Sequence, residues 1–146
     1  VLVVNDGFEL EAKNRLARIG FDRVVGYLQF PTMVMADNPD RVVRASRMTA
    51  PEFDARRNDI DGLQLVDIRN PGEVEHGTIP GASTIPVGQL PGRLDELDPT
   101  APTVVYCAGG YRSSVAASVL RQAGFDDVSD IIGGYGAWTE VQPASA

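Results

Sequence analysis

The chain has 146 residues, of which 43% are hydrophobic and 23% charged, and its net charge is −7 at pH 7. This length suits one domain with a hydrophobic core and is short for two. The acidic surplus and the absence of a long apolar run argue against nucleic acids and membranes as partners. A single cysteine allows no internal disulfide, which fits a reducing, cytoplasmic compartment.

The first thirty residues are predicted to form a strand, a helix and a second strand. Apolar residues at helical spacing predict a helix from Glu9 to Ile19, and Gly20 is a typical residue to end it. Valine-rich runs at residues 1–4 and 24–28 predict the two strands.

Part of this segment resembles a later part of the chain. Residues 16–24 and 120–128 share a helix end followed by Gly-Phe-Asp and then a valine. We therefore interpret residues 1–30 as the end of a preceding, degenerate repeat that lacks the cysteine of the later copy. The alternative is that both are ordinary strand–helix units of an α/β protein.

Residues 31–41 are predicted to be a linker. Pro31, Asn38 and Pro39 should break regular structure there. The main domain then extends over residues 42–146.

The main domain is predicted to begin with an edge strand over residues 42–47. Thr49 and Glu52 form a capping-box pattern for a helix over residues 50–57. An apolar run at residues 63–66 predicts the next strand.

Two charged residues, Asp67 and Arg69, follow that strand directly. We expect them to hold neighbouring loops by charge-assisted hydrogen bonds. Further along, residues 85–87 are predicted to be extended and residues 89–97 to form a short helix.

The most informative stretch joins a strand over residues 103–106 to a helix over residues 112–123. Cys107 lies at this junction, followed by two glycines, an arginine and two serines. Backbone N–H groups can converge on an anion at such a junction, and the start of a helix lowers the pKa of a thiol. Arg112 adds a fixed positive charge.

An isolated cysteine is more often a small buried hydrophobe than a nucleophile, and a Gly-Gly pair is often only a turn. The combination of Cys107, Gly109, Gly110 and Arg112 in one run favours a nucleophile inside an anion-binding loop.

A last strand is predicted over residues 128–132, and Trp138 is expected to pack in the core. The strands alternate with helices and are mostly continuous apolar runs. This pattern predicts an α/β fold with a parallel sheet covered on both faces, and the cysteine loop at the carboxyl ends of its strands.

The run Cys107–Arg112 resembles the active-site loop of the rhodanese family, Cys-x-x-Gly-x-Arg. Residues 67–82 resemble the family's first signature, and residues 133–138 its closing signature. One position departs from the pattern, because Thr78 stands where the family usually has histidine. The only histidine, His76, lies two residues earlier, and we assign it no catalytic role.

This resemblance implies a three-layer fold with about five parallel strands and a sulfurtransferase that carries sulfur as a persulfide of Cys107. The expected partners are a small sulfur donor, thiosulfate or a low-molecular-weight persulfide, and a thiol or cyanide acceptor. No metal or organic cofactor is expected. Asp67 and Arg69 would support the site, and the sulfur and the donor anion would be held by the loop residues Ala108, Gly109, Gly110, Tyr111, Arg112 and Ser113.

Two other functions remain open at this point. A Cys-dependent phosphatase or arsenate reductase could use Cys107 and Arg112, but the related phosphatases have five residues between these positions and this chain has four. A non-catalytic interaction or regulatory module could keep the fold, although the intact cysteine argues against it.

Residues 20–28 are similar to a segment of proteins in which a metallo-β-lactamase-like domain precedes rhodanese-like domains. This second resemblance implies that the chain is the C-terminal fragment of such a persulfide-handling fusion, with that domain upstream. A homo-oligomer stays open.

Overall fold

The computed structural model describes residues 1–18 and 20–142. The chain divides into two compact units, residues 1–44 and residues 45 onwards. Each unit is described by itself below.

The N-terminal unit contains α1 (Glu9–Ala17), α2 (Pro31–Asp37) and the 3₁₀ turn η1 (Pro39–Arg41). The strands predicted at residues 1–4 and 24–28 are wrong, because the two segments share only one parallel bridge, between Leu2 and Tyr27. The ladder consists of the bonds from Leu2 N to the carbonyl of Gly26 and from Leu28 N to the carbonyl of Leu2, both 2.8 Å long. The predicted end of the first helix at Ile19 lies outside the described residues.

The expectation that Pro31, Asn38 and Pro39 break regular structure at residues 31–41 is also wrong, because this segment forms α2 and η1. Pro31 and Pro39 are the first residues of α2 and η1. A proline suits this position because its N–H would have no partner in the helix and its fixed φ is helical. Asn38 follows the end of α2, and its Nδ2 donates to the carbonyl of Val34 at 2.8 Å.

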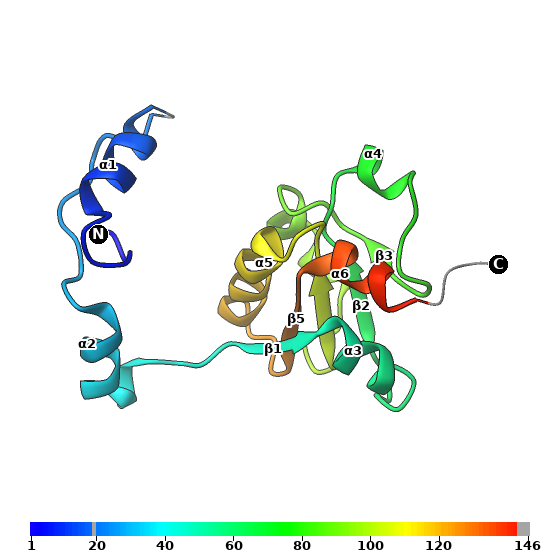
Figure 1. The fold of residues 1–146 in the computed structure, drawn as a ribbon. Helices are drawn as coiled ribbons and strands as arrows, with labels where there is room; N and C mark the ends of the chain where they lie inside the picture. The colour runs from blue at the N-terminus through cyan, green and yellow to red at the C-terminus, as the bar shows by residue number, and fades with distance from the viewer. Residues whose placement is uncertain (19, 143–146) are drawn as a thin grey trace. The chain divides into compact units, whose positions relative to one another are not determined.

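The C-terminal unit is built on one five-stranded parallel sheet (Figure 1), as the sequence predicted. The strand order is β1-β5-β4-β2-β3. The strands are β1 (Ser46–Thr49), β2 (Gln64–Asp67), β3 (Ser83–Thr84), β4 (Thr103–Tyr106) and β5 (Val128–Ile132). The edge strand begins at Ser46 and not at Val42, because its partner β5 pairs with it only from Ser46 onwards.

Helices cover both faces of this sheet. One face carries α5 (Tyr111–Gln122), whose buried residues pack with Val66 and Val105. The other face carries α3 (Ala50–Arg56) and α6 (Gly134–Val141), which pack with Val104 and Tyr106. Successive residues of β4 therefore serve two separate cores, because side chains alternate between the faces of a strand.

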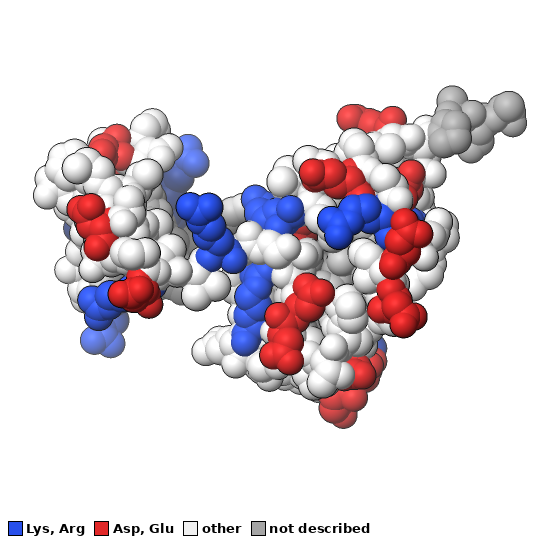
Figure 2. All heavy atoms as spheres, turned by 90° about the horizontal axis from the view of Figure 1, so that it is seen from below, with Lys and Arg blue, Asp and Glu red and all other residues white. Residues whose placement is uncertain are grey.

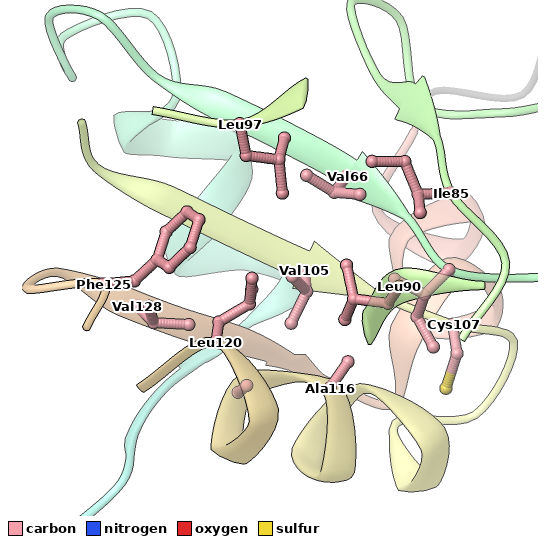
Figure 3. Packing of buried hydrophobic residues seen from close by; sticks show 12 residues of the cluster. Val66, Ile85, Leu90, Leu97, Val105, Cys107, Ala116, Leu120, Phe125 and Val128 are labelled. Carbon is pink, nitrogen blue, oxygen red and sulfur yellow. The ribbon is translucent and has the colours of Figure 1, made fainter. Parts of the chain in front are cut away.

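All four residues of β4 are buried, so the strand that leads to the cysteine is fixed from both sides. Figure 3 shows the core on the α5 face, where Cys107 lies beyond the end of β4 near Leu90 and Ala116. Each large apolar side chain buried here contributes about 1.5–3 kcal/mol. The predicted place of Trp138 in the other core is confirmed, since it is 8% exposed.

Several shorter elements differ from their predicted form. The helix expected over residues 89–97 is two 3₁₀ turns, η2 (Leu90–Gly92) and η3 (Leu94–Glu96), separated by Arg93, whose backbone is not helical. The piece expected to be extended over residues 85–87 follows the short β3 and continues its hydrogen bonds to the β2 edge.

The first helix of the domain has the predicted capping box, because Thr49 N donates to Glu52 Oε2 at 2.8 Å and Glu52 N donates back to the Thr49 hydroxyl.

Charged side chains of both signs are interspersed on the face drawn in Figure 2. Some of the chain's charged residues are paired, among them Arg93 with Glu96 and Arg112 with Glu73. Among the described residues, no helix is both long enough and apolar enough to cross a lipid bilayer.

Candidate active site

Cys107 lies in the turn between β4 and α5, at the carboxyl edge of the sheet. Gly110, which precedes α5, has φ +86°, a conformation that side chains rarely adopt. A Cβ atom at this glycine would also lie 2.8 Å from the backbone nitrogen of Gly133. Both facts explain why this turn needs glycine at its last position.

The sulfur of Cys107 faces the inside of this turn. Gly110 N donates to Sγ at 3.1 Å, and Sγ lies 3.7 Å from the hydroxyl oxygen of Ser113. Burial of the thiol raises its pKa, but hydrogen bonds from Ser113 and from the backbone of Gly109 and Gly110 outweigh burial and lower the pKa. The thiolate of Cys107 is therefore easier to form than that of an ordinary cysteine, although the side chain is only 1% exposed.

Helix α6 fixes the outer side of the loop. Tyr135 N donates to the carbonyl of Cys107 at 2.7 Å, and Gly136 N donates to the carbonyl of Ala108 at 3.0 Å. These two carbonyls therefore point toward α6, away from the sulfur. Of the loop residues predicted to bind the sulfur, Gly109, Gly110 and Ser113 surround it. The side chain of Tyr111 is exposed instead.

Arg112 makes a two-pronged ion pair with Glu73 of the short helix α4 (Pro71–Val74). Its Nη1 and Nη2 donate to the two carboxylate oxygens at 2.7 and 2.6 Å. The sequence predicts that this guanidinium binds the donor anion or stabilises the loop, and in the structure its fork is engaged by the carboxylate of Glu73. The charge of Arg112 still interacts with Cys107. The pKa of Arg112 is raised, chiefly by its hydrogen bond to Glu73 and also by the charge of Cys107.

The Arg112–Glu73 pair predicts a pH-dependent stability. Hydrogen bonding from Arg112 lowers the pKa of Glu73 from 4.5 to about 2, so its contribution is present above pH 4.5 and is lost as the pH falls toward 2. We expect Glu73→Gln to lower the free energy of unfolding by about 1 kcal/mol near neutral pH, since the pair is partly exposed and screened. Denaturant unfolding at several pH values measures this difference.

The control for this prediction is Glu96→Gln, which breaks the more exposed pair with Arg93. It should have a smaller effect than Glu73→Gln at neutral pH. A difference between wild type and Glu73→Gln that stays constant down to pH 2 would contradict the prediction.

Asp67 and Arg69 form a buried ion pair next to the loop that follows β2. Arg69 Nη2 donates to Asp67 Oδ2 at 2.6 Å and to the carbonyl of Gly77 at 2.7 Å. The guanidinium also lies 4.0 Å from the ring centre of Tyr135, at the start of α6. Arg69 thereby ties this loop to β2 and to the helix that supports the cysteine loop.

Thr78, which stands where the rhodanese family usually has histidine, takes part in a partly buried chain of hydrogen bonds. Ile79 N donates to the hydroxyl of Tyr106 at 3.0 Å, that hydroxyl lies 2.6 Å from Thr78 Oγ1, and Thr78 donates to Asp67 at 3.1 Å. Burial raises the pKa of Tyr106 to about 12, which keeps it a donor. His76 is exposed, and its Nδ1 contacts only the carbonyl of Gly72, 2.9 Å away.

Sequence reasoning missed three residues around the cysteine loop: Glu73, Arg47 and Asp130. Asp130 is fully buried in β5, and Arg47 of β1 donates to both of its carboxylate oxygens, at 2.9 and 2.8 Å. One signal was available for Asp130, because a charged residue in the middle of an apolar strand needs a partner. No local pattern indicates which residue that partner is.

The fold and the site together define a class of protein. A thiol beside backbone N–H groups at the start of a helix, beyond a parallel sheet, is an arrangement suited to a nucleophilic cysteine. The family model described as Rhodanese-like domain matches residues 49–141. The chain therefore belongs to the rhodanese-like family.

Known proteins of this family agree with the assignment. The chain is 39% identical over 83 residues to a protein named Sulfurtransferase from Allochromatium vinosum, covering 57% of this chain and 78% of the relative. It is 39% identical over 95 residues to Thiosulfate sulfurtransferase GlpE of Pseudomonas aeruginosa, covering 65% and 86%. The crystal structure of a rhodanese-like domain protein from Staphylococcus aureus superposes with a TM-score of 0.60 at 30% identity, covering 64% and 90%. These relatives support sulfurtransferase activity in general terms.

Proposed function

We propose that this domain transfers sulfane sulfur from thiosulfate or a low-molecular-weight persulfide to a thiol or cyanide, through a persulfide on Cys107. The observation that carries the proposal is the position of Sγ, 3.1 Å from Gly110 N inside a turn that lowers the pKa of the thiol. A thiolate in such a turn is a nucleophile at neutral pH.

In the first step, the thiolate of Cys107 attacks the outer sulfur of thiosulfate. A new S–S bond forms, the S–S bond of thiosulfate breaks, and sulfite leaves with the electron pair of that bond. The product is a persulfide of Cys107 whose outer sulfur carries the negative charge. The N–H groups of the turn stabilise this charge without reorganising, because α6 already holds the loop.

Before the second step, the outer sulfur takes up a proton from solvent, and an acceptor thiolate then attacks this protonated sulfur and keeps the proton with it. The acceptor becomes a persulfide, and Cys107 leaves as a thiolate, which restores the starting state. With cyanide, the products are thiocyanate, the same thiolate and a proton released to solvent. Each step breaks one S–S bond and forms one S–S bond, or one S–C bond with cyanide, and no electrons enter or leave, so the transfer requires no metal or redox cofactor.

The size of the loop supports sulfur transfer over phosphoryl transfer. Four residues separate Cys107 from Arg112, which makes a small ring of N–H groups. The Arg112 fork pairs with Glu73, whereas a phosphatase would use such a fork for the substrate.

Intact-mass measurement after incubation with a donor tests the proposal. Thiosulfate should add one sulfur atom to the protein, and cyanide or a thiol should remove it. A gain from glutathione persulfide alone would keep the class and favour the persulfide-handling fusion with an upstream metallo-β-lactamase-like domain. No gain from either donor, in protein shown to be folded, would refute the sulfurtransferase and leave a binding module as the better proposal.

A further inference from the structure

Ser113 lies between the sulfur of Cys107 and a buried carboxylate. Its Oγ is 3.7 Å from Cys107 Sγ and 3.3 Å from Asp130 Oδ2. Ser113 and Asp130 are both completely buried. Because a hydroxyl has one proton, Ser113 can donate to only one of these two acceptors at a time.

Asp130 can release the hydroxyl at low cost. Arg47 Nε donates to its Oδ1 at 2.9 Å and Arg47 Nη2 to its Oδ2 at 2.8 Å, so both oxygens stay hydrogen-bonded when the hydroxyl turns away. The two residues meet because β1 and β5 pair in a register that sets Arg47 beside Asp130. Arg47 Nη2 also lies 3.4 Å from the carbonyl of Gly110, which ties the pair to the cysteine loop.

We propose that Ser113 is a two-position hydroxyl switch, for which Asp130 and the Cys107 sulfur compete. When Cys107 is a thiol, its S–H donates to Ser113 Oγ and the hydroxyl donates to Asp130. When Cys107 is a thiolate, no S–H remains, the sulfur becomes the stronger acceptor and the hydroxyl turns to it.

Sulfur loading returns the switch to Asp130, and in this respect the inference rests on the proposed function. In the persulfide, the inner sulfur is bonded to a second sulfur and is a weak acceptor. When the acceptor thiolate removes the outer sulfur, Cys107 leaves as an anion and the hydroxyl turns back to it. Asp130 and Arg47 are thus positioning residues, since they act on the sulfur only through Ser113.

Other charged groups face this cluster and are left unchanged by the test. Arg112 of α5 acts on the sulfur, and it is paired with Glu73 of α4. Asp67 and Arg69 compensate each other's charge beside Tyr135.

The first test is a double-mutant cycle of Asp130→Asn and Ser113→Ala. The thiolate absorbance of Cys107 is titrated against pH without any sulfur donor. Asp130→Asn should lower the pKa of Cys107 by about 1 unit. Part of this shift comes from the lost carboxylate charge, and part arises because the Ser113 hydroxyl is free to donate to the sulfur. In the Ser113→Ala background, the same change should produce less than half of that shift.

The second cycle uses Arg47→Gln, a change on the edge strand where the side chain is partly exposed. Without the guanidinium, Asp130 should hold the hydroxyl more tightly, so the pKa of Cys107 should rise. Ser113→Ala should remove most of this rise. This cycle decides the question if Asp130→Asn does not fold.

The switch is overturned if, in whichever cycle gives folded variants, the pKa shift of Cys107 is the same with and without Ser113. Such additive shifts would mean that charge acts on the sulfur through space, which does not need Ser113. The outcome is separable from the proposed function, since the titration uses no donor. If the pKa shifts of Cys107 depend on Ser113 but the protein gains no sulfur from a donor, the switch is supported and the proposed sulfurtransferase activity is contradicted. Sulfur gain with additive shifts would contradict the switch alone.

Discussion

Replacing Cys107 with serine is expected to abolish sulfur loading from both thiosulfate and glutathione persulfide. Cys107 is the only cysteine in the chain, and a serine hydroxyl does not ionise near neutral pH, so no persulfide can form there. The serine oxygen can still accept the hydrogen bond from Gly110 N, and the fold should remain intact. Intact mass measures loading, and thermal unfolding checks the fold.

The matched control is Ser118→Ala, also in α5. Ser118 is exposed and its hydroxyl contacts only the carbonyl of Ser114, so this variant should load sulfur like the wild type. Loading of the Cys107→Ser variant by one sulfur atom would place the reaction on another group and would overturn the proposed mechanism.

The second large effect is expected from Gly134→Ala, at the first residue of α6. Gly134 has φ +58°, and an added Cβ would collide with the carbonyl of Cys107 and lie 2.9 Å from the backbone of Ala108. Backbone atoms cannot turn aside as a flexible side chain can. We expect a loss of about 3 kcal/mol in stability, from left-handed strain and overpacking together, and a large fall in the rate of sulfur loading.

Gly124→Ala separates the two causes. Gly124 also has a positive φ, +92°, but an added Cβ there has no neighbour within 4 Å. It should lose only the strain, about 1 kcal/mol, and keep its loading rate. Denaturant unfolding and the time course of intact mass compare the two variants. Equal effects on the loading rate would show that the contact between Gly134 and the cysteine loop does not shape the site.

Strands β2, β4 and β5 were predictable because each contains a short apolar run between helical patterns, whereas the edge strand β1 is polar and was predicted at the wrong residues. The four residues of β4 and the junction that holds Cys107 form one continuous signal, and local rules suffice for it. The capping box at Thr49 was predictable for the same reason, since both partners lie within one turn.

Two predictions failed in the N-terminal unit, one because a strand depends on distant neighbours and one because proline has two roles. The runs at residues 1–4 and 24–28 have the composition of strands, but a strand needs partners along its length and these share one bridge. Pro31 and Pro39 were interpreted as helix breakers, although proline also begins helices. The choice between these roles depends on whether the residues after the proline can continue a helix.

The site shows the same division. The cysteine loop is contiguous and was predictable, whereas the partners of its side chains come from other strands and helices. Glu73 lies 39 positions before Arg112, and Asp130 lies 83 after Arg47. Pairings at such separations depend on strand order and register, which the sequence pattern alone does not specify.

The hydrogen bonds from α6 to the carbonyls of Cys107 and Ala108 also have a consequence for folding during synthesis. A ribosome makes β4 and the cysteine loop before it makes α6. Until Tyr135 and Gly136 have emerged, the carbonyls of Cys107 and Ala108 lack the two donors that hold them in the folded protein. We therefore expect the loop that carries Cys107 to reach its final shape only when α6 docks on it.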